Sequence, residues 1–390
     1  MVKQLVNTLA QKIIEELLVD VDIKINGTRE WDIIVNDPII YGKIVFGGSL
    51  ALGETYMQGL WDSRELDKTL TVLLSAKLDQ RIPSLPSTLL KLKSTFFNLQ
   101  SVSRSKNSLA NYELGNEFYE LLLDTHMQYT CGYWKNAKNL EEAQEAKLEL
   151  ICKKLQLKPG MRVLELGSGW GGFAEYAAKN YNCQITAYNI AEKQVAYTRK
   201  KTKSLPVAIM LTDYREAKKL AREQGKFDRV ASMGLCEHVG YKNHRTLMEV
   251  VDACLTDEGL FLLHTIGKDV SVHHTDPWLQ KYIFPNTVIS SVKQISTAVE
   301  GLFVMEDWHN FGHDYDKTLK AWYNNFNSNW ETIKELDCVK QTFTGDTEKF
   351  KRMWTYYLSS AAASFRSRKN QLWQIVFSKG HLAEEYKSIR

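Results

Sequence analysis

The chain has 390 residues, which suffices for one large domain or for two to three smaller ones. Hydrophobic residues make up 44% of it and charged residues 25%, and the net charge of +4 is too small to indicate nucleic acid as a partner. Six scattered cysteines without a C-x-x-C pair argue against a disulfide framework and favour a reducing, cytoplasmic compartment. No apolar run is long enough to span a bilayer, and Glu15 and Glu16 interrupt the segment where a signal peptide would be apolar.

Residues 1–80 are predicted to form a small N-terminal α+β domain related to lipid or membrane contact. Residues 5–18 place leucine and isoleucine on one helical face. Residues 21–27 and 30–37 alternate like short strands, and 47–62 read as a glycine-punctuated loop and helix.

Residues 81–108 are predicted to be a basic linker. The stretch from Arg81 to Tyr112 contains five basic residues and no acidic one, together with prolines and many serines. Such a composition is typical of a connection between domains. A second interpretation, compatible with the first, is a segment that touches anionic lipid.

Residues 109–390 are predicted to form the catalytic domain, an α/β unit with a Rossmann-like, mostly parallel sheet and helices on both faces. From residue 160 onward, short β-rich runs alternate with helical stretches, as in doubly wound sheets. In such sheets ligands bind outside the carboxyl ends of the strands. The predicted strand ends are Gly167, Asn189, Asp213, Gly234 and Gly267.

A glycine-rich turn, "VLELGSGWGGF", follows the first of these strands. Gly167 and Gly169 allow a close approach of the backbone to a ligand, a pattern that dinucleotide sites share and that could also be a purely structural turn. Glu165, two residues before Gly167, favours S-adenosylmethionine (SAM), because E-x-G-x-G is common in SAM sites and the carboxylate is suited to the ammonium group. Asp213 is expected near the adenine. The second strand ends in Asn189 rather than an acidic residue, which leaves the ribose to Asn189, Gln194 or the backbone.

Four further stretches carry unusual polar residues. They contain Cys131, Glu237, His264 and Tyr315, the last within an expected aromatic loop. Each alone is better explained as a core residue, but Glu237 and His264 both follow or end strands on the ligand side of one sheet. Their wide separation makes a metal site a weak interpretation, and none is predicted.

In combination these stretches resemble the cyclopropane-fatty-acid synthases, including the mycolic-acid cyclopropane synthases. Ser168 departs from the cysteine that the family often has between the first two glycines, where only the backbone is expected to bind. The motifs that carry the resemblance are "GGSLALGETYMQGLWD", "HMQYTCGYW", "LELGSGWGG", "MGLCEHVG", "HTIG", "FPN", "FGHDYDKTLKAW" and "LWQIVFSKG".

The resemblance implies transfer of a methylene group from SAM to the cis double bond of an unsaturated phospholipid, through a carbocation that bound bicarbonate deprotonates. It implies a homodimer as well. The implied bicarbonate ligands are Cys131, Gly234, Glu237, His264, Ile266 and Tyr315, with glycine and isoleucine acting through the backbone. The implied SAM contacts, together with Glu165, are Tyr129, Thr130, Gly167, Gly169, Asn189, Ile190, Gln194, Asp213 and Tyr214.

A phospholipid substrate requires peripheral contact with the membrane, expected at the inner face of the cell membrane. Residues 349–383 contain seven lysines and arginines and no acidic residue. Residues 349–365 also place apolar side chains on one helical face, which we interpret as a wall of an acyl tunnel with the basic residues as candidate headgroup contacts.

Two other functions remain open from the sequence. One is a SAM-dependent acyl-chain methyltransferase that does not close a ring. The other is a lipid-binding relative without catalytic activity, against which the presence of Cys131, Glu237, His264 and Tyr315 argues.

Overall fold

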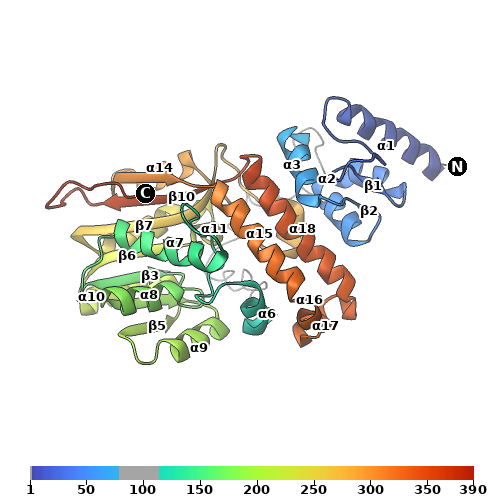
Figure 1. The fold of residues 1–390 in the computed structure, drawn as a ribbon. Coiled ribbons are helices and arrows are strands. Elements are labelled where there is room, and N and C mark those ends of the chain that lie inside the picture. Colours follow the sequence, from blue (N-terminus) through green and yellow to red (C-terminus); the bar gives the residue numbers. More distant parts are fainter. Residues whose placement is uncertain (1, 79–113) are drawn as a thin grey trace.

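A computed structural model describes residues 2–78 and 114–390, with side chains from residue 7 onward, and its centre is a mixed β-sheet (Figure 1). The strand order is β5-β4-β3-β6-β7-β10-β9, and β8 pairs with the end of β7. The strands are β3 (Arg162–Leu166), β4 (Gln184–Asn189), β5 (Val207–Leu211), β6 (Phe227–Met233), β7 (Leu255–Lys268), β8 (Ser290–Ser291), β9 (Val304–Asn310) and β10 (Gln371–Ser378).

The five predicted strands are confirmed as β3 to β7, and they pair in parallel. Two further strands were not predicted: β10 pairs antiparallel with β7 on one side and with β9 on the other. Strand β7 also continues to Lys268, so His264 lies within it rather than at its end.

Helices cover both faces of the sheet, as predicted. Alternate residues of each strand point to opposite faces, and Leu164 and Val163 accordingly belong to different hydrophobic clusters. One face packs against α10 (Ala217–Gln224), α12 (His244–Cys254) and α14 (Val292–Val299). The other packs against α7 (Leu140–Lys154), α8 (Gly172–Tyr181) and α9 (Glu192–Lys201).

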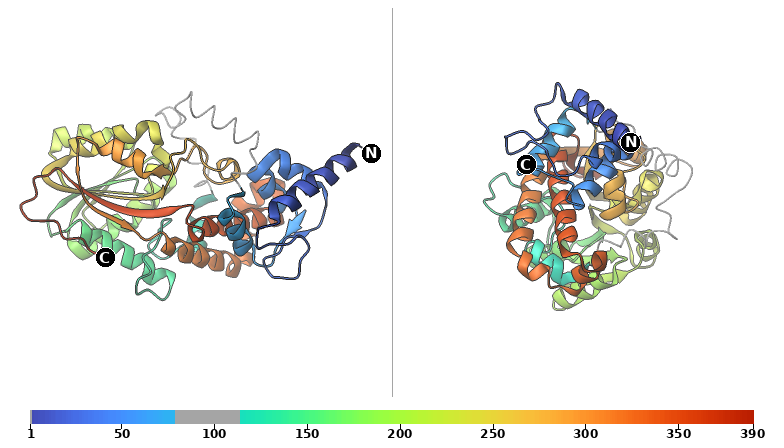
Figure 2. Two further views of the ribbon diagram at one scale, coloured as in Figure 1. Left: turned by 90° about the horizontal axis from the view of Figure 1, so that it is seen from above. Right: turned by 90° about the vertical axis from the view of Figure 1, so that its right-hand side faces the viewer.

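A helical layer lies between the sheet and the N-terminal segment (Figure 2). Its two long helices, α15 and α18, pack side by side. The predicted apolar face of α18 is buried, including Phe350, Trp354 and Phe365. The elements of this layer and its surroundings are α6 (Gly115–Leu122), α11 (Cys236–Val239), α13 (Pro277–Tyr282), α15 (His313–Ser328), α16 (Trp330–Ile333), α17 (Asp337–Gln341) and α18 (Thr347–Arg366).

The N-terminal segment is mainly helical. It contains α1 (Val2–Leu18), α2 (Ile39–Met57), α3 (Leu66–Ser75), β1 (Ile34–Val35) and β2 (Trp61–Asp62). Of the two predicted strands, residues 30–37 contain β1, which pairs with β2. Residues 21–27 contribute only one isolated bridge, between Ile25 and Ile33. Helix α2 is kinked at Gly48, whose φ of 57° and ψ of −138° are not helical.

The N-terminal segment shares a hydrophobic core with the helical layer. Tyr56 and Trp61 belong to the same buried cluster as Trp278 and Trp354. The predicted linker 81–108 lies outside the described residues. Within the described part of the chain, we find no helix that is both long enough and apolar enough to cross a membrane.

Two of the basic residues that are candidate headgroup contacts, Arg352 and Arg366, join these parts of the protein. Arg352 forms an ion pair with Asp62 at 2.7 Å. Arg366 pairs with Asp67 of α3 at 2.8 Å and with Asp316 of α15 at 2.7 Å. These side chains are structural, because their charges are balanced by carboxylates of neighbouring elements.

Candidate active site

One cavity of about 450 Å³ joins the carboxyl ends of the strands to α15, α18 and the N-terminal helices. A smaller one of about 80 Å³ adjoins it, and the two share Gly167, Asn189, Ile190, Leu235 and His238. The predicted residues that line the large cavity are Tyr129, Thr130, Glu165, Gly167, Gly169, Asn189, Ile190, Gln194, Gly234, Glu237, His264, Ile266 and Tyr315. Asp213 and Tyr214 line the small cavity, and Cys131 lines neither.

The glycine-rich turn is fixed to the next strand by its backbone. The N–H groups of Gly167 and Ser168 both donate to the carbonyl of Tyr188, at 3.0 and 3.1 Å. Gly167 has φ +84°, and a Cβ there would stand 3.1 Å from the Cβ of Leu235, whereas nothing lies within 4 Å of a Cβ at Gly169. The turn thus leaves a cradle along its backbone that side chains at these positions would fill.

Asn189 and Gln194 form a small polar network beside this turn. The Asn189 amide donates to the carbonyl of Gly169 at 3.0 Å and to Oε1 of Gln194 at 2.9 Å. Asn189 therefore positions the turn. Nε2 of Gln194 is buried without a hydrogen-bond partner, which makes this amide the donor available to a ribose hydroxyl.

Glu165 is buried below the turn, with 1% of its surface exposed. Burial raises the pKa of its carboxyl group to about 8, although the nearby Lys147 opposes the shift. Oε2 of Glu165 has no hydrogen-bond partner. Such an orphaned carboxylate oxygen fits the ammonium group that the sequence assigned to it.

Lys147 is a residue that the sequence reasoning missed. It is completely buried on α7, and its ammonium group donates to Oε1 of Gln128 and, at 3.0 Å, to the hydroxyl of Thr130. Burial lowers the pKa of Lys147 to about 8. The available signal was a lysine among Ala143, Leu148 and Ile151 at helical spacing, because buried lysines are rare unless they have a specific partner.

Asp213 and Tyr214 follow β5. The Asp213 carboxylate accepts from the backbone N–H of Arg215 at 3.0 Å and from its guanidinium group at 2.9 Å. The hydroxyl of Tyr214 is buried without a partner, and burial raises its pKa. Of these two, Tyr214 therefore carries the unsatisfied polar atom at the small cavity.

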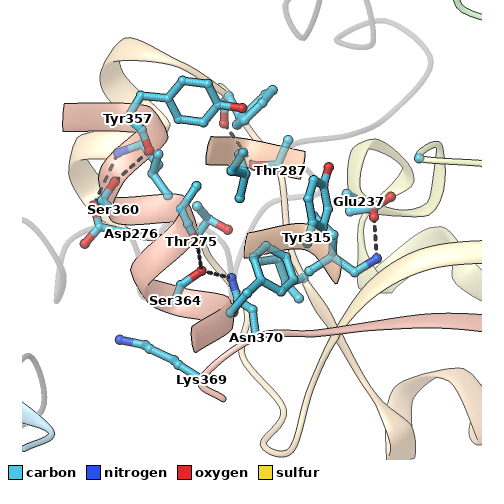
Figure 3. Close-up of a pocket in the computed structure, with 18 of the residues that line it drawn as sticks. Glu237, Thr275, Asp276, Thr287, Tyr315, Tyr357, Ser360, Ser364, Lys369 and Asn370 are labelled. Carbon is cyan, nitrogen blue, oxygen red and sulfur yellow. Dashed lines mark hydrogen bonds between the residues drawn. The ribbon is translucent and has the colours of Figure 1, made fainter. Parts of the chain in front are cut away.

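Glu237 is the second residue of the short helix α11, which begins shortly after β6 ends at Met233. Its Oε1 accepts from the backbone N–H of Ile266 at 2.7 Å, so two of the predicted ligands are joined to each other (Figure 3). Oε2 is buried without a hydrogen-bond partner. Burial raises the pKa of Glu237, and the hydrogen bond from Ile266 opposes this shift.

His264 is 1% exposed, and burial lowers its pKa well below the usual value. Nε2 of Gln374 lies 3.4 Å from its Nδ1. With the Gln374 amide in this orientation, Nδ1 of His264 accepts the hydrogen bond. The proton of the neutral imidazole ring is therefore assigned to Nε2 of His264, which has no hydrogen-bond partner. His264 thus offers a donor in the cavity in which Glu237 offers an acceptor.

Cys131 and Tyr315 differ in their relation to the cavity. Tyr315 lies in the first turn of α15, not in a loop as predicted, and its ring packs against Phe365 with centroids 4.5 Å apart. The thiol of Cys131 is buried next to the carbonyl of Gly132 and the hydroxyl of Thr318, and burial raises its pKa well above the usual value. Cys131 is therefore a neutral thiol behind the cavity wall.

The site as a whole combines a polar cradle with an apolar chamber that contains several aromatic side chains. Tyr129 links the two, because its hydroxyl donates to the hydroxyl of Tyr357 on α18 at 3.0 Å. Orphaned polar atoms of Glu165, Gln194, Glu237 and His264 all belong to residues that line this one cavity. Such an arrangement is suited to group transfer between a polar donor and an apolar acceptor from which water is excluded.

Residues 100–375 match the sequence family described as mycolic acid cyclopropane synthetase. The cyclopropane-fatty-acyl-phospholipid synthase of Escherichia coli K12 is 46% identical over 371 residues, which cover 95% of this chain and 93% of that protein. The sphingolipid C9-methyltransferase of Komagataella phaffii is 30% identical over 69% of this chain and 57% of its own length.

Solved structures share the fold. The mycolic acid cyclopropane synthase CmaA1, complexed with SAH and CTAB, has a TM-score of 0.61 at 24% identity and covers 70% of this chain and 98% of its own. Coclaurine N-methyltransferase with SAH has a TM-score of 0.65 at 21% identity, over 84% of this chain and 97% of its own. The chain has the SAM-dependent methyltransferase fold and belongs to the mycolic acid cyclopropane synthetase family.

Proposed function

We propose that this protein transfers a methylene group from SAM to the cis double bond of unsaturated phospholipid acyl chains and closes a cyclopropane ring. The observation that carries the proposal is the single cavity that runs from the glycine-rich turn past Glu237 to apolar walls on α18 and the N-terminal helices. The 46% identity to the Escherichia coli phospholipid enzyme, over 95% of the chain, supports the same reaction.

SAM fits the polar end of this cavity. The backbone cradle at Gly167 and Gly169 and the orphaned atoms of Glu165 and Gln194 would hold it, with Asn189 fixing the turn. The remaining proposed contacts are Tyr129, Thr130, Ile190, Asp213 and Tyr214. When bound, SAM supplies an electrophilic methyl group. The residues of the protein orient this methyl group toward the apolar chamber and exclude water.

Bicarbonate fits the pair formed by Glu237 and His264. Oε2 of Glu237 is suited to accept a hydrogen bond from its OH, and Nε2 of His264 to donate to its oxygens. Gly234, Ile266 and Tyr315 line the same part of the cavity, whereas Cys131 lies behind the cavity wall and would not contact the ion directly. The role of these residues is to hold a weak base in a dry pocket, where it accepts the proton released on ring closure.

The remaining parts of the proposal concern partners. We infer peripheral contact with the inner face of the cell membrane, where the unsaturated phospholipid resides, and a homodimer as in the family. The apolar cavity walls on α18, with Tyr357, Ala361 and Phe365, support an acyl chain as the ligand.

Product analysis tests the proposal. The protein is incubated with SAM and vesicles of an unsaturated phospholipid, and the acyl chains are analysed by mass spectrometry. We expect a gain of one CH2 and loss of the olefin. A methyl-branched product would instead support the second candidate, acyl-chain methylation without ring closure, which relatives named as fatty acid and sphingolipid methyltransferases at about 30% identity keep open.

A further inference from the structure

One hydrogen bond joins the two proposed ligand sites of the cavity. Tyr129 belongs to the proposed SAM contacts, and Tyr357 of α18 belongs to the apolar wall of the acyl chamber (Figure 3). The Tyr129 hydroxyl donates to the Tyr357 hydroxyl at 3.0 Å, although the two residues are 228 positions apart in the sequence. A displacement of either tyrosine therefore disturbs a bond to a residue of the other site.

The ring of Tyr129 is enclosed by other aromatic rings. Its centroid lies 5.2 Å from that of Tyr119, 5.1 Å from that of Trp322 and 6.3 Å from that of Phe284. Tyr119 and Trp322 are both buried. This packing restricts the ring of Tyr129, and the bond to Tyr357 helps to fix the hydroxyl at its tip.

Tyr357 lies on the face of α18 that lines the acyl chamber. Ala361 and Phe365 follow it at spacings of four residues, so the three side chains share one face of the helix, and all three line the cavity. Phe284 contacts both tyrosines, because its ring centroid lies 5.6 Å from that of Tyr357 and 6.3 Å from that of Tyr129. An acyl chain on this face would pack against the Tyr357 ring in the rotamer that makes the bond to Tyr129.

We propose that Tyr357 is a positioning residue that holds Tyr129 at the SAM site and makes SAM and the acyl chain bind cooperatively. This inference rests on the proposed function, which places the two ligands, and adds a coupling between them. An acyl chain packed against Tyr357 favours the bonded rotamer, so Tyr129 has less freedom to lose when SAM binds. The coupling is reciprocal, because SAM must raise the affinity for the acyl chain by the same factor.

The test measures the binding of S-adenosylhomocysteine (SAH), which has no methyl group to transfer, so that no turnover occurs during the titration. Calorimetry gives the SAH affinity in neutral detergent micelles with and without dioleoyl phosphatidylglycerol. One hydrogen bond between two hydroxyls changes an equilibrium about fivefold. We expect the lipid to raise the SAH affinity of the wild-type protein, by at most about that factor.

The two hydroxyls are removed one at a time and together. Tyr129→Phe and Tyr357→Phe should each lower the SAH affinity about fivefold and abolish the effect of the lipid. The double variant should bind SAH no more weakly than Tyr129→Phe alone, because both changes remove the same bond. Tyr356→Phe is the matched control, since Tyr356 is the adjacent tyrosine of α18 but packs against Trp278, with ring centroids 4.6 Å apart. This control should keep the wild-type SAH affinity and the wild-type lipid effect.

The coupling and the proposed function fail in different ways. Additive losses in the double variant would overturn the positioning role of Tyr357. A lipid effect that is absent from the wild-type protein, or that persists in Tyr357→Phe, would overturn the coupling. A purely structural role gives the latter result, since it would lower the melting temperature of Tyr357→Phe and leave the lipid effect unchanged. Absence of SAH binding to the wild-type protein, or of a cyclopropane product from SAM and the same lipid, would instead refute the proposed function.

Discussion

Glu237 lies in an unusual environment for a glutamate in the candidate active site. It is buried, bonded through one oxygen to the Ile266 amide, and left with the other oxygen unsatisfied. Glu237→Gln keeps the shape and removes the charge. A correctly placed base contributes about 10²–10⁴-fold to a proton transfer, so we expect turnover to fall by that order while SAM affinity by calorimetry stays near normal. Wild-type turnover in Glu237→Gln would contradict the role of Glu237 in holding the proton acceptor.

The pH profile offers an independent measurement of the same group. Burial raises the pKa of Glu237, and the carboxylate form is the one that accepts a hydrogen bond from bicarbonate. Activity should therefore fall on the acid side at a pH above the usual glutamate range of about 4.3. The residual activity of Glu237→Gln should lack this acid limb. An unchanged limb would assign it to another group.

Lys147 and Lys154 form a natural comparison, since both are fully buried on α7. Lys147 contacts Gln128 and Thr130 at the SAM end, whereas Lys154 pairs with Asp307 at 3.2 Å, away from the cavity. We expect Lys147→Met to weaken SAM binding about tenfold, from one lost charged hydrogen bond, with a smaller change in kcat. Lys154→Met should reduce only thermal stability. Equal SAM affinities in the two variants would remove the positioning role of Lys147.

At the scale of elements, the strand–turn–helix of β3 and α8 is the feature on which SAM binding depends. Gly167→Ala should weaken SAM binding more than tenfold, because it combines a left-handed φ, costing about 1–2 kcal/mol for an L-residue, with crowding of Leu235. Gly160 has nearly the same φ, +83°, in open space. Gly160→Ala is thus a control for strain alone and should leave SAM affinity unchanged; a similar loss in both variants would contradict the cradle.

Sequence patterns predicted elements well where periodicity was strong. Strands β3, β6 and β7 contain runs of buried residues, which is typical of strands covered on both faces. The sequence patterns did not predict β9, because its sequence "VMEDWHN" contains charged residues. Strand β9 pairs with β10, and its Asp307 forms an ion pair with Arg390. The contact of Lys147 with Gln128 and Thr130 could not be predicted, because it depends on how α7 packs against the segment that precedes it.

At the scale of the whole molecule, the N-terminal segment is part of one core rather than an appendage. Tyr56 and Trp61 pack in the same cluster as Trp278 and Trp354. We therefore expect calorimetry to show a single unfolding transition. Arg366→Met, which breaks the partly exposed bridges to Asp67 and Asp316, should destabilise that one transition by about 1 kcal/mol. Two separate transitions would show that residues 1–80 fold independently.

The fate of the transferred carbon tests the central claim most directly. The wild-type protein is given SAM with a fully deuterated methyl group and vesicles of a dioleoyl phospholipid, and the acyl chains are analysed by mass spectrometry and NMR. Ring closure by loss of one proton from the transferred carbon predicts a saturated product that keeps two of the three deuterium atoms on a cyclopropane carbon. A product that keeps all three, or that retains an olefin next to the added carbon, would contradict ring formation in this cavity.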